Sequence, residues 1–236
     1  MYPNLIVDNF FDDPDSIVDL STNLKYSPSE DGKWPGLRSD NLHKIDYALF
    51  DFVCRKISHL FYPDCEGWTY HLSFQKVMPF SKNQYDKRNC GWIHKDKINF
   101  GGVIFLTKKP DDDTGVTIYR PKRGGYNMPP HIEEVKNMHF FGNEVDDDRY
   151  YKAYADYHNQ FEETIKVKNV YNRLVLFNSN SLHAVQTFDF NFKVENIKII
   201  PGAYDVVISS KLLSEFTNKQ YNLKYFIALE PDSTFG

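Results

Sequence analysis

The feature that most constrains this chain is a short motif, His94-Lys95-Asp96, together with His183, which lies 89 residues further on. Side chains alternate between the two faces of a β-strand, so residues i and i+2 point the same way. A strand that carries the motif directs one imidazole and one carboxylate to a single point. A second imidazole from a neighbouring strand, that of His183, completes a set of three ligands that leaves positions on a metal ion open. We therefore expect a fold that makes these two distant segments neighbours.

The surroundings of both histidines favour such a placement. The motif lies between two apolar stretches, residues 72–77 and 102–106, which are rich in residues typical of strands. His183 follows the apolar run Leu174-Val175-Leu176-Phe177 and a polar turn, Asn178-Ser179-Asn180-Ser181. A histidine that opens a strand after such a turn is expected at the mouth of a barrel. We assign the metal triad to His94, Asp96 and His183.

Composition narrows the class of protein. The 236 residues suit one domain, and 19 Phe, 16 Tyr and 3 Trp can supply a large core. The sequence shows neither a long apolar stretch nor a signal-peptide pattern, which predicts a cytoplasmic protein with no membrane segment. Three cysteines at unrelated spacings indicate reduced thiols, and a net charge of −4 gives no reason to expect nucleic-acid binding.

The order of patterns predicts an α+β fold. A helix is expected to begin near Asp13 or Asp15 and another to cover residues 42–61, after a loop over residues 27–39. Strands are expected from there on, with 114–120 as the hairpin partner of 100–106 and one short helix at 206–216. The expected strands cover residues 68–77, 100–106, 114–120, 165–167, 173–177, 192–200 and 221–229. Helices followed by many short strands indicate an antiparallel sandwich or barrel.

The chain is expected to form a single domain over residues 1–236, with residues 1–67 as helical support. Residues 121–165 differ from the strands on either side in their prolines, tyrosines and charges, and we interpret them as a lid or substrate-recognition insert. Two acidic runs, residues 111–113 and 146–148, are expected at solvated loop tips, because like charges resist burial.

With these pieces in place, the chain resembles the 2-oxoglutarate- and Fe(II)-dependent dioxygenases, in particular the prolyl-4-hydroxylase-like branch with its small bacterial and phage relatives. The resemblance covers roughly residues 68–230, and a further segment, Trp34-Pro35-Gly36-Leu37-Arg38-Ser39, is similar to a stretch in phage relatives. The matching motifs occur in the family's order: Phe74-Gln75-Lys76-Val77, His94-x-Asp96, Gly102-Val103-Ile104-Phe105-Leu106, Gly115-Val116-Thr117-Ile118-Tyr119-Arg120, Asn172-Arg173-Leu174-Val175-Leu176-Phe177 and His183.

The resemblance implies a double-stranded β-helix (a jelly roll, cupin-like) with Fe(II) held by His94, Asp96 and His183. It also implies 2-oxoglutarate and O2 as co-reactants, succinate and CO2 as products, and hydroxylation of a C–H bond. The substrate would be a small molecule or a peptide, such as a peptidyl or free amino acid.

The family also has an arginine or lysine that binds the distal carboxylate of 2-oxoglutarate, usually soon after the second histidine. This chain has no arginine after Arg173. Lys224, on the strand expected at 221–229, is our first candidate for that role, with Lys219 and Lys198 behind it. Arg120 is a competitor from another strand, and Tyr119 could donate its phenol to the same carboxylate.

Two alternatives stay open at this point. The missing arginine favours a non-catalytic β-helix protein that binds a metal or ligand but has lost cosubstrate turnover. A zinc hydrolase could use the same three ligands, but the sequence places no obvious general base beside them. Metal content separates the hydrolase from the oxygenase, and succinate formation separates the oxygenase from the binding protein.

Overall fold

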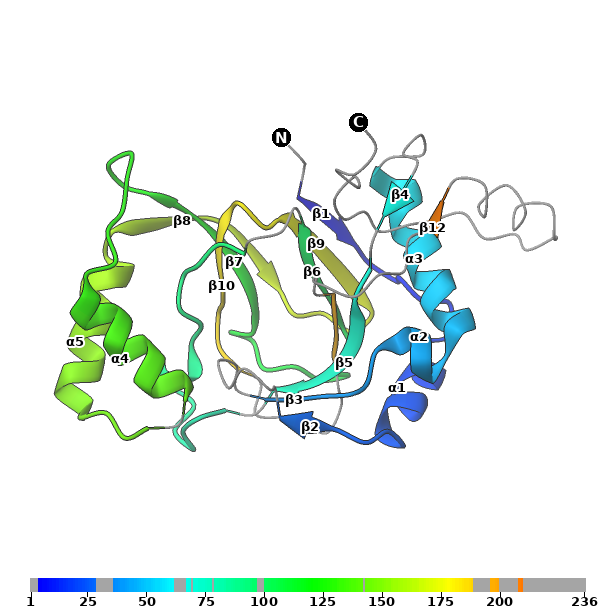
Figure 1. Ribbon diagram of the computed structural model, residues 1–236, viewed down its shortest axis with the longest axis horizontal. Helices are drawn as coiled ribbons and strands as arrows, with labels where there is room; N and C mark the ends of the chain where they lie inside the picture. The colour runs from blue at the N-terminus through cyan, green and yellow to red at the C-terminus, as the bar shows by residue number, and fades with distance from the viewer. Residues whose placement is uncertain are drawn as a thin grey trace.

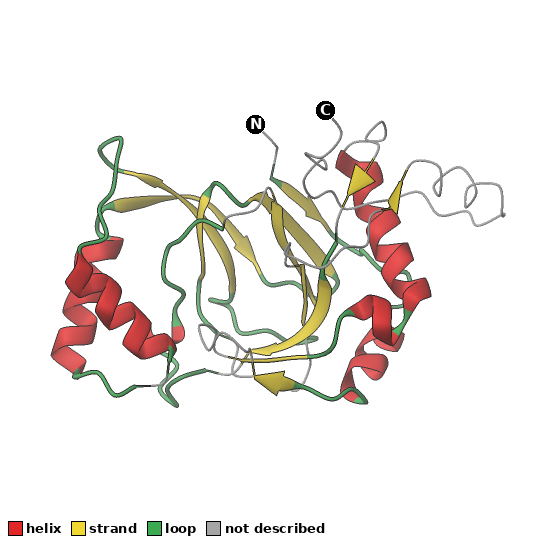
Figure 2. Ribbon diagram, viewed as in Figure 1, coloured by secondary structure: helices red, strands yellow, loops and turns green. Residues whose placement is uncertain are grey.

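Two antiparallel sheets face each other in the computed structural model, and each carries helices on its outer side (Figures 1 and 2). The structure describes residues 4–28, 36–61, 67–68, 70–77, 79–96, 100–141, 143–188, 196–199 and 208–209. The mixed α+β class with antiparallel strands confirms the expectation from the sequence. No helix in these residues is long and apolar enough to cross a membrane.

The larger sheet has seven strands in the order β1-β9-β6-β11-β5-β3-β2. These strands are β1 (Leu5–Val7), β2 (Ser27–Pro28), β3 (Gly36–Arg38), β5 (Leu72–Val77), β6 (Phe100–Phe105), β9 (Arg173–Asn178) and β11 (Asn196–Ile199). Every neighbouring pair is antiparallel. β2 and β3 lie within the segment expected as a loop, so that prediction was wrong at both ends of residues 27–39.

The smaller sheet has the order β10-β7-β8, with β7 (Gly115–Pro121), β8 (Phe161–Lys168) and β10 (Leu182–Val185). The predicted hairpin between residues 100–106 and 114–120 is wrong. β6 pairs with β9 and β11, whereas β7 crosses to the other sheet and pairs with β10 and β8. Gly115, with φ at 137°, lies where the crossing chain enters β7.

Three helices cover the outer face of the larger sheet: α1 (Pro14–Thr22), α2 (Leu42–Ile45) and α3 (Tyr47–Phe61). Their apolar faces pack on Leu72, Phe74, Ile104, Leu174 and Leu176, which share the outer side of the sheet. The helix expected over residues 42–61 is broken at Asp46. That residue adopts an extended conformation, and its carboxylate accepts the Leu49 N–H at 2.9 Å, so that it caps the new helix.

Two further helices cover the smaller sheet on its outer face: α4 (Pro130–Phe140) and α5 (Asp147–His158). They form a second core with Trp92, Ile93, Leu182 and Ala184. The acidic run 146–148 is not a loop tip. Asp146 caps α5 and accepts the Arg149 N–H at 3.0 Å, and the two following aspartates lie in the first helical turn, where the helix dipole favours negative charge.

A third cluster fills the space between the sheets. It consists of Phe105, Val116, Ile118, Val167, Val175 and Phe177, with Val103 packed against it. Alternation along each strand explains this division, since Leu174 and Leu176 face the helices while Val175 and Phe177 face the interior.

Two predictions near the end of the chain have different outcomes. Ile208–Ser209 forms the short strand β12, paired with β4 (Gly67–Trp68), so the helix expected at 206–216 is wrong at these two residues. The β-branched run Val206-Val207-Ile208 suits an extended chain better than a helix. The strand expected at 221–229 lies outside the described residues.

Candidate metal centre

The motif segment lies along the free edge of β10. Gly91 N–H donates to Val185 O at 2.9 Å, and Asp96 N–H donates to Ser179 O at 3.0 Å. Between them, His94 and His183 form an antiparallel bridge. Residues 91–96 are therefore extended and paired, although the bridge is isolated and does not form the regular strand that we expected. The neighbouring-strand placement of the two histidines is confirmed.

This pairing brings the three predicted ligands together. His94 Nε2 lies 3.6 Å from Asp96 Oδ1, and His183 Nε2 lies 3.4 Å from Asp96 Oδ2. One ligand atom from each residue lies within 4.8 Å of the others. Directly opposite residues of an antiparallel pair share a face, and so do residues i and i+2, which is why all three side chains converge.

The hydrogen bonds of the imidazoles suit metal binding. His94 Nδ1 lies 2.8 Å from Trp92 O, and His183 Nδ1 lies 2.9 Å from Ser181 O. A carbonyl can only accept, so each Nδ1 carries the proton and each neutral ring has a bare lone pair at Nε2. Both lone pairs face a carboxylate, an arrangement that is repulsive unless a cation lies between them. A backbone carbonyl is a common partner for the second nitrogen of a metal-bound histidine.

The surroundings of His94 also disfavour its protonated form. Desolvation of the imidazole by the surrounding protein is the largest effect, and with the neighbouring His183 it lowers the pKa of His94 to about 4. Asp96 acts in the opposite direction. Near neutral pH this ring is therefore uncharged, the form that binds a metal.

The site is closed on one side and open on the other. The side chain of His183 is 6% exposed and its ring lies 4.4 Å from that of Phe177, whereas the side chains of His94 and Asp96 are 42% and 34% exposed. A metal held here would thus have three protein ligands on one side and space for others on the opposite side.

Polar side chains of β5, and one from the turn that precedes β10, are buried. Ser73, Gln75 and Ser179 are at most 2% exposed, yet Ser73 Oγ, Gln75 Nε2 and Ser179 Oγ have no hydrogen-bond partner among the described residues. Buried polar atoms normally have partners, and positions 196 and 198 of β11 lie opposite Gln75 and Ser73. The alternation of His71, Ser73 and Gln75 in the sequence predicts one polar face of this strand, and burial of Ser73 and Gln75 agrees with it.

Of the candidates for binding the distal carboxylate, Tyr119 and Arg120 are directed away from the triad. Tyr119 lies on the outer face of β7, packs on the second core, and lines a hollow of about 850 Å³ beside α5. Arg120 is exposed, and its Nε lies 2.6 Å from Glu162 Oε1. Lys219 and Lys224 lie outside the described residues. Position 198 lies in β11, opposite Ser73 on one side and Val103 on the other.

Two residues have structural roles. Arg173 makes a two-pronged ion pair with Asp8, with Nε to Oδ1 at 2.5 Å and Nη2 to Oδ2 at 2.8 Å. Trp92 is 1% exposed, as expected of a core residue.

The sequence did not indicate a role for Tyr157, whose phenol donates to Ile93 O at 3.0 Å, one residue before the first ligand. The spacing of tyrosines on the helical stretch before residue 160 was the available signal.

Comparison with protein families gives a match over most of the chain. Residues 2–189 match the family described as a family of unknown function, DUF6445. The chain belongs to this family. The matched region contains all three residues of the candidate metal centre and ends before position 198. A search among proteins of curated function gives no match.

Proposed function

We propose that this DUF6445 protein is an Fe(II)- and 2-oxoglutarate-dependent dioxygenase that hydroxylates a C–H bond, with a double-stranded β-helix as its scaffold. The observation that carries the proposal is the convergence of His94, Asp96 and His183, with both Nε2 atoms facing one carboxylate. Two histidines and a carboxylate on one face, with the other positions open, are typical of non-haem Fe(II) oxygenases.

The strand order supports the scaffold. Eight successive extended segments run from β5 through residues 91–96, β6, β7, β8, β9 and β10 to β11. In the larger sheet the neighbours are β5, β11, β6 and β9, which are the first, eighth, third and sixth of these segments. On the other side the neighbours are residues 91–96, β10, β7 and β8, which are the second, seventh, fourth and fifth. This alternation between two facing sheets is the order of a jelly roll.

Within this proposal, the protein residues have separate tasks. The two histidines and Asp96 hold the ion, and the carbonyls of Trp92 and Ser181 keep each imidazole in the tautomer that binds it. Bound Fe(II) would supply the activation of O2 and the oxidative decarboxylation of 2-oxoglutarate. The apolar interior cluster around Phe177 keeps bulk water from the closed side of the site.

The register of the sheets suggests where the cosubstrate lies. Phe177, whose ring contacts His183, pairs with Gly101, and one two-residue step further into the barrel Val175 pairs with Val103. That step is about 7 Å along a strand. Position 198 lies in this second row, together with Ser73. Lys198 is therefore a candidate for the distal carboxylate at least equal to Lys224, which was our first choice.

Two measurements test the proposal. In the first, the protein is loaded anaerobically with a mixture of Fe(II) and Zn(II), and its metal content is analysed. The wild type should hold one equivalent of metal per chain, and the Asp96→Ala variant should not retain it. Incubation of the Fe(II) form with 2-oxoglutarate and O2 should release succinate. If the protein binds metal but releases no succinate with candidate peptides and amino acids present, the non-catalytic binding protein is favoured. If all three triad variants still bind the metal, the proposed site is overturned.

A further inference from the structure

The helical insert packs against the segment that leads into the metal centre. Trp92 and Ile93 are 1% and 0% exposed, and α5 covers them. The indole of Trp92 lies edge-on to Tyr150 at 6.0 Å and to Tyr154 at 5.4 Å, and 5.9 Å from the ring of Tyr157. The contacts of the insert thus lie on the outer side of the small sheet, directly behind the first ligand. Its role as a lid or recognition element stays a prediction.

A single hydroxyl links this helix to the ligand-bearing main chain. Tyr157, 2% exposed, donates to Ile93 O at 3.0 Å across 64 residues of sequence. Burial raises the pKa of this phenol, so it keeps the proton that it donates. Buried hydroxyls of this kind are hydrogen-bonded because an unpaired one is costly.

The Ile93 carbonyl and the His94 N–H belong to one planar peptide unit. Tyr157 holds the carbonyl end of this unit, and His183 O accepts the N–H end at 3.0 Å. The adjacent carbonyl, that of Trp92, accepts from His94 Nδ1 at 2.8 Å. The direction of the His94 side chain and its tautomer therefore depend on two peptide units that α5 supports.

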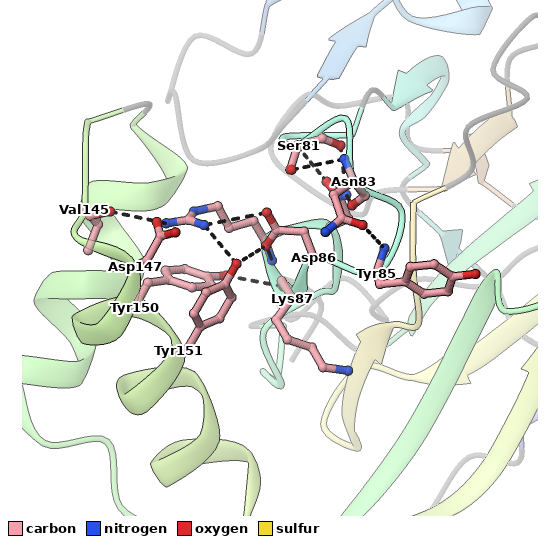
Figure 3. Close-up of polar contacts among 11 residues, drawn as sticks. Ser81, Asn83, Tyr85, Asp86, Lys87, Val145, Asp147, Tyr150 and Tyr151 are labelled. Carbon is pink, nitrogen blue, oxygen red and sulfur yellow. Dashed lines mark hydrogen bonds and ion pairs between the residues drawn. The ribbon is translucent and has the colours of Figure 1, made fainter.

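The other end of α5 is tied to the same segment. Arg88 Nη2 lies 2.5 Å from Asp147 Oδ1, and Arg88 Nη1 donates to the hydroxyl of Tyr151 at 3.1 Å (Figure 3). The Tyr151 hydroxyl in turn donates to Asp86 Oδ1 at 3.0 Å. Contacts at Asp147 and Tyr157 thus hold α5 along the chain that runs from Asp86 to His94.

We infer that Tyr157 is a positioning residue for the metal centre: by holding the Ile93 carbonyl it keeps His94 in the orientation and tautomer that bind the ion. This inference rests on the proposed metal site but concerns a residue outside it. The insert then has a function beyond covering the sheet, because α5 transmits its own position to the first ligand.

Tyr157→Phe removes only the hydroxyl and leaves the ring on Trp92. Tyr150→Phe is the matched control: Tyr150 lies on the same helix, is 0% exposed and packs on the same indole. Its hydroxyl reaches Lys87 O only at 3.5 Å, the limit of a hydrogen bond, and interacts with the indole side chain of Trp92. No described hydrogen bond joins it to the main chain of residues 91–96, which is the contact that Tyr157 makes.

The experiment has one readout without metal and one with Co(II). Long-range ¹H–¹⁵N spectra of the metal-free protein report the tautomer of each histidine. We expect a pure Nδ1–H form of His94 in the wild type and Tyr150→Phe, and a mixture in Tyr157→Phe. Groups that hold a metal ligand in place contribute about 10- to 100-fold in affinity, and Tyr157 acts one step further away, so we expect about fivefold weaker Co(II) binding.

Each outcome has a distinct meaning. Equal tautomer populations in the wild type and Tyr157→Phe would overturn the inference, as would equal losses of Co(II) affinity in both variants. If the wild type binds no Co(II), the proposed function fails, whereas the tautomer comparison still decides the positioning role. A melting temperature that falls equally in both variants, with the tautomer altered in Tyr157→Phe alone, supports the inference.

Discussion

His94 and His183 lie directly opposite each other and exchange two main-chain hydrogen bonds, His94 N–H to His183 O at 3.0 Å and His183 N–H to His94 O at 2.9 Å. Their rings are consequently on one face, with centroids 4.4 Å apart. Two residues that lie 89 positions apart in the sequence are thereby fixed as a pair before any metal binds, which limits the reorganisation that binding would require.

Removing one ligand should abolish tight metal binding without unfolding the protein. We expect His94→Ala, Asp96→Ala and His183→Ala each to lose stoichiometric Fe(II), because two remaining ligands cannot hold the ion. His131→Ala, an exposed histidine on α4, is the control and should retain the metal. Metal analysis after anaerobic dialysis checks this, with circular dichroism for the fold. Stoichiometric iron in the His94→Ala and Asp96→Ala proteins would contradict the assignment.

The pairing of the motif segment with β10 depends on Gly91. A Cβ at this position would lie 2.7 Å from Val185 N and 3.0 Å from Val185 O, so Gly91→Ala should push the two chains apart. We expect a loss of about 1–3 kcal/mol in the free energy of unfolding, typical of overpacking, together with weaker metal binding.

Gly125→Ala is the matched control for Gly91→Ala, because a Cβ at Gly125 meets nothing within 4 Å. Urea unfolding and a Co(II) titration of both variants make the comparison. Identical stability and affinity in the two proteins would show that the segment does not pair with β10 as described.

Buried neutral histidines should make the protein sensitive to mild acid. Burial lowers the pKa of His139 to about 4 and that of His158 to about 3, against a value near 6.5 in an unfolded chain. Below pH 6.5 the unfolded chain binds protons that the folded protein does not, so stability is complete above pH 6.5 and falls from there towards pH 4.

For His139, which is 6% exposed, the loss approaches about 1.4 kcal/mol per pH unit within that window. Urea unfolding of metal-free protein at pH 7.5, 6.0 and 5.0 measures the slope. His139→Phe removes one such group. The free energy of unfolding should then fall less steeply with decreasing pH, by the equivalent of about one bound proton. A slope equal to that of the wild type would contradict the burial of a neutral ring at this position.

The cation for the distal carboxylate can be identified with three variants. Loss of a charge-assisted partner costs a few kcal/mol, so the correct substitution should weaken 2-oxoglutarate binding at least tenfold. Lys198→Ala and Lys224→Ala compare the register-based and the sequence-based candidates. Arg120→Ala should have little effect, because Arg120 is exposed and paired with Glu162. Weakening by Arg120→Ala alone would assign the distal carboxylate to Arg120 and contradict both lysine candidates.

The convergence of His94, Asp96 and His183 could be predicted from the sequence, because short local patterns indicate it. The i, i+2 spacing of His94 and Asp96 sets a common face, and a polar turn before His183 sets the start of a strand. The alternation of Ser73 and Gln75 likewise indicated a polar face. These patterns depend on backbone geometry that a short stretch determines by itself.

The pairing of strands could not be predicted in the same way. Residues 100–106 and 114–120 are adjacent in sequence and similar in composition, yet β6 and β7 belong to different sheets. Which strand is a partner depends on contacts between distant segments, such as β6 with β9, that no local pattern encodes. The role of Tyr157 was hidden for the same reason, since its partner carbonyl lies 64 residues away.

The most direct test of the account is a titration of 2-oxoglutarate into the anaerobic Fe(II)-loaded protein, followed by visible spectroscopy, with His183→Ala as the control. The account predicts a weak, saturable charge-transfer band from the chelated cosubstrate that is lost in the control. One equivalent of bound iron without any band at saturating 2-oxoglutarate would contradict it.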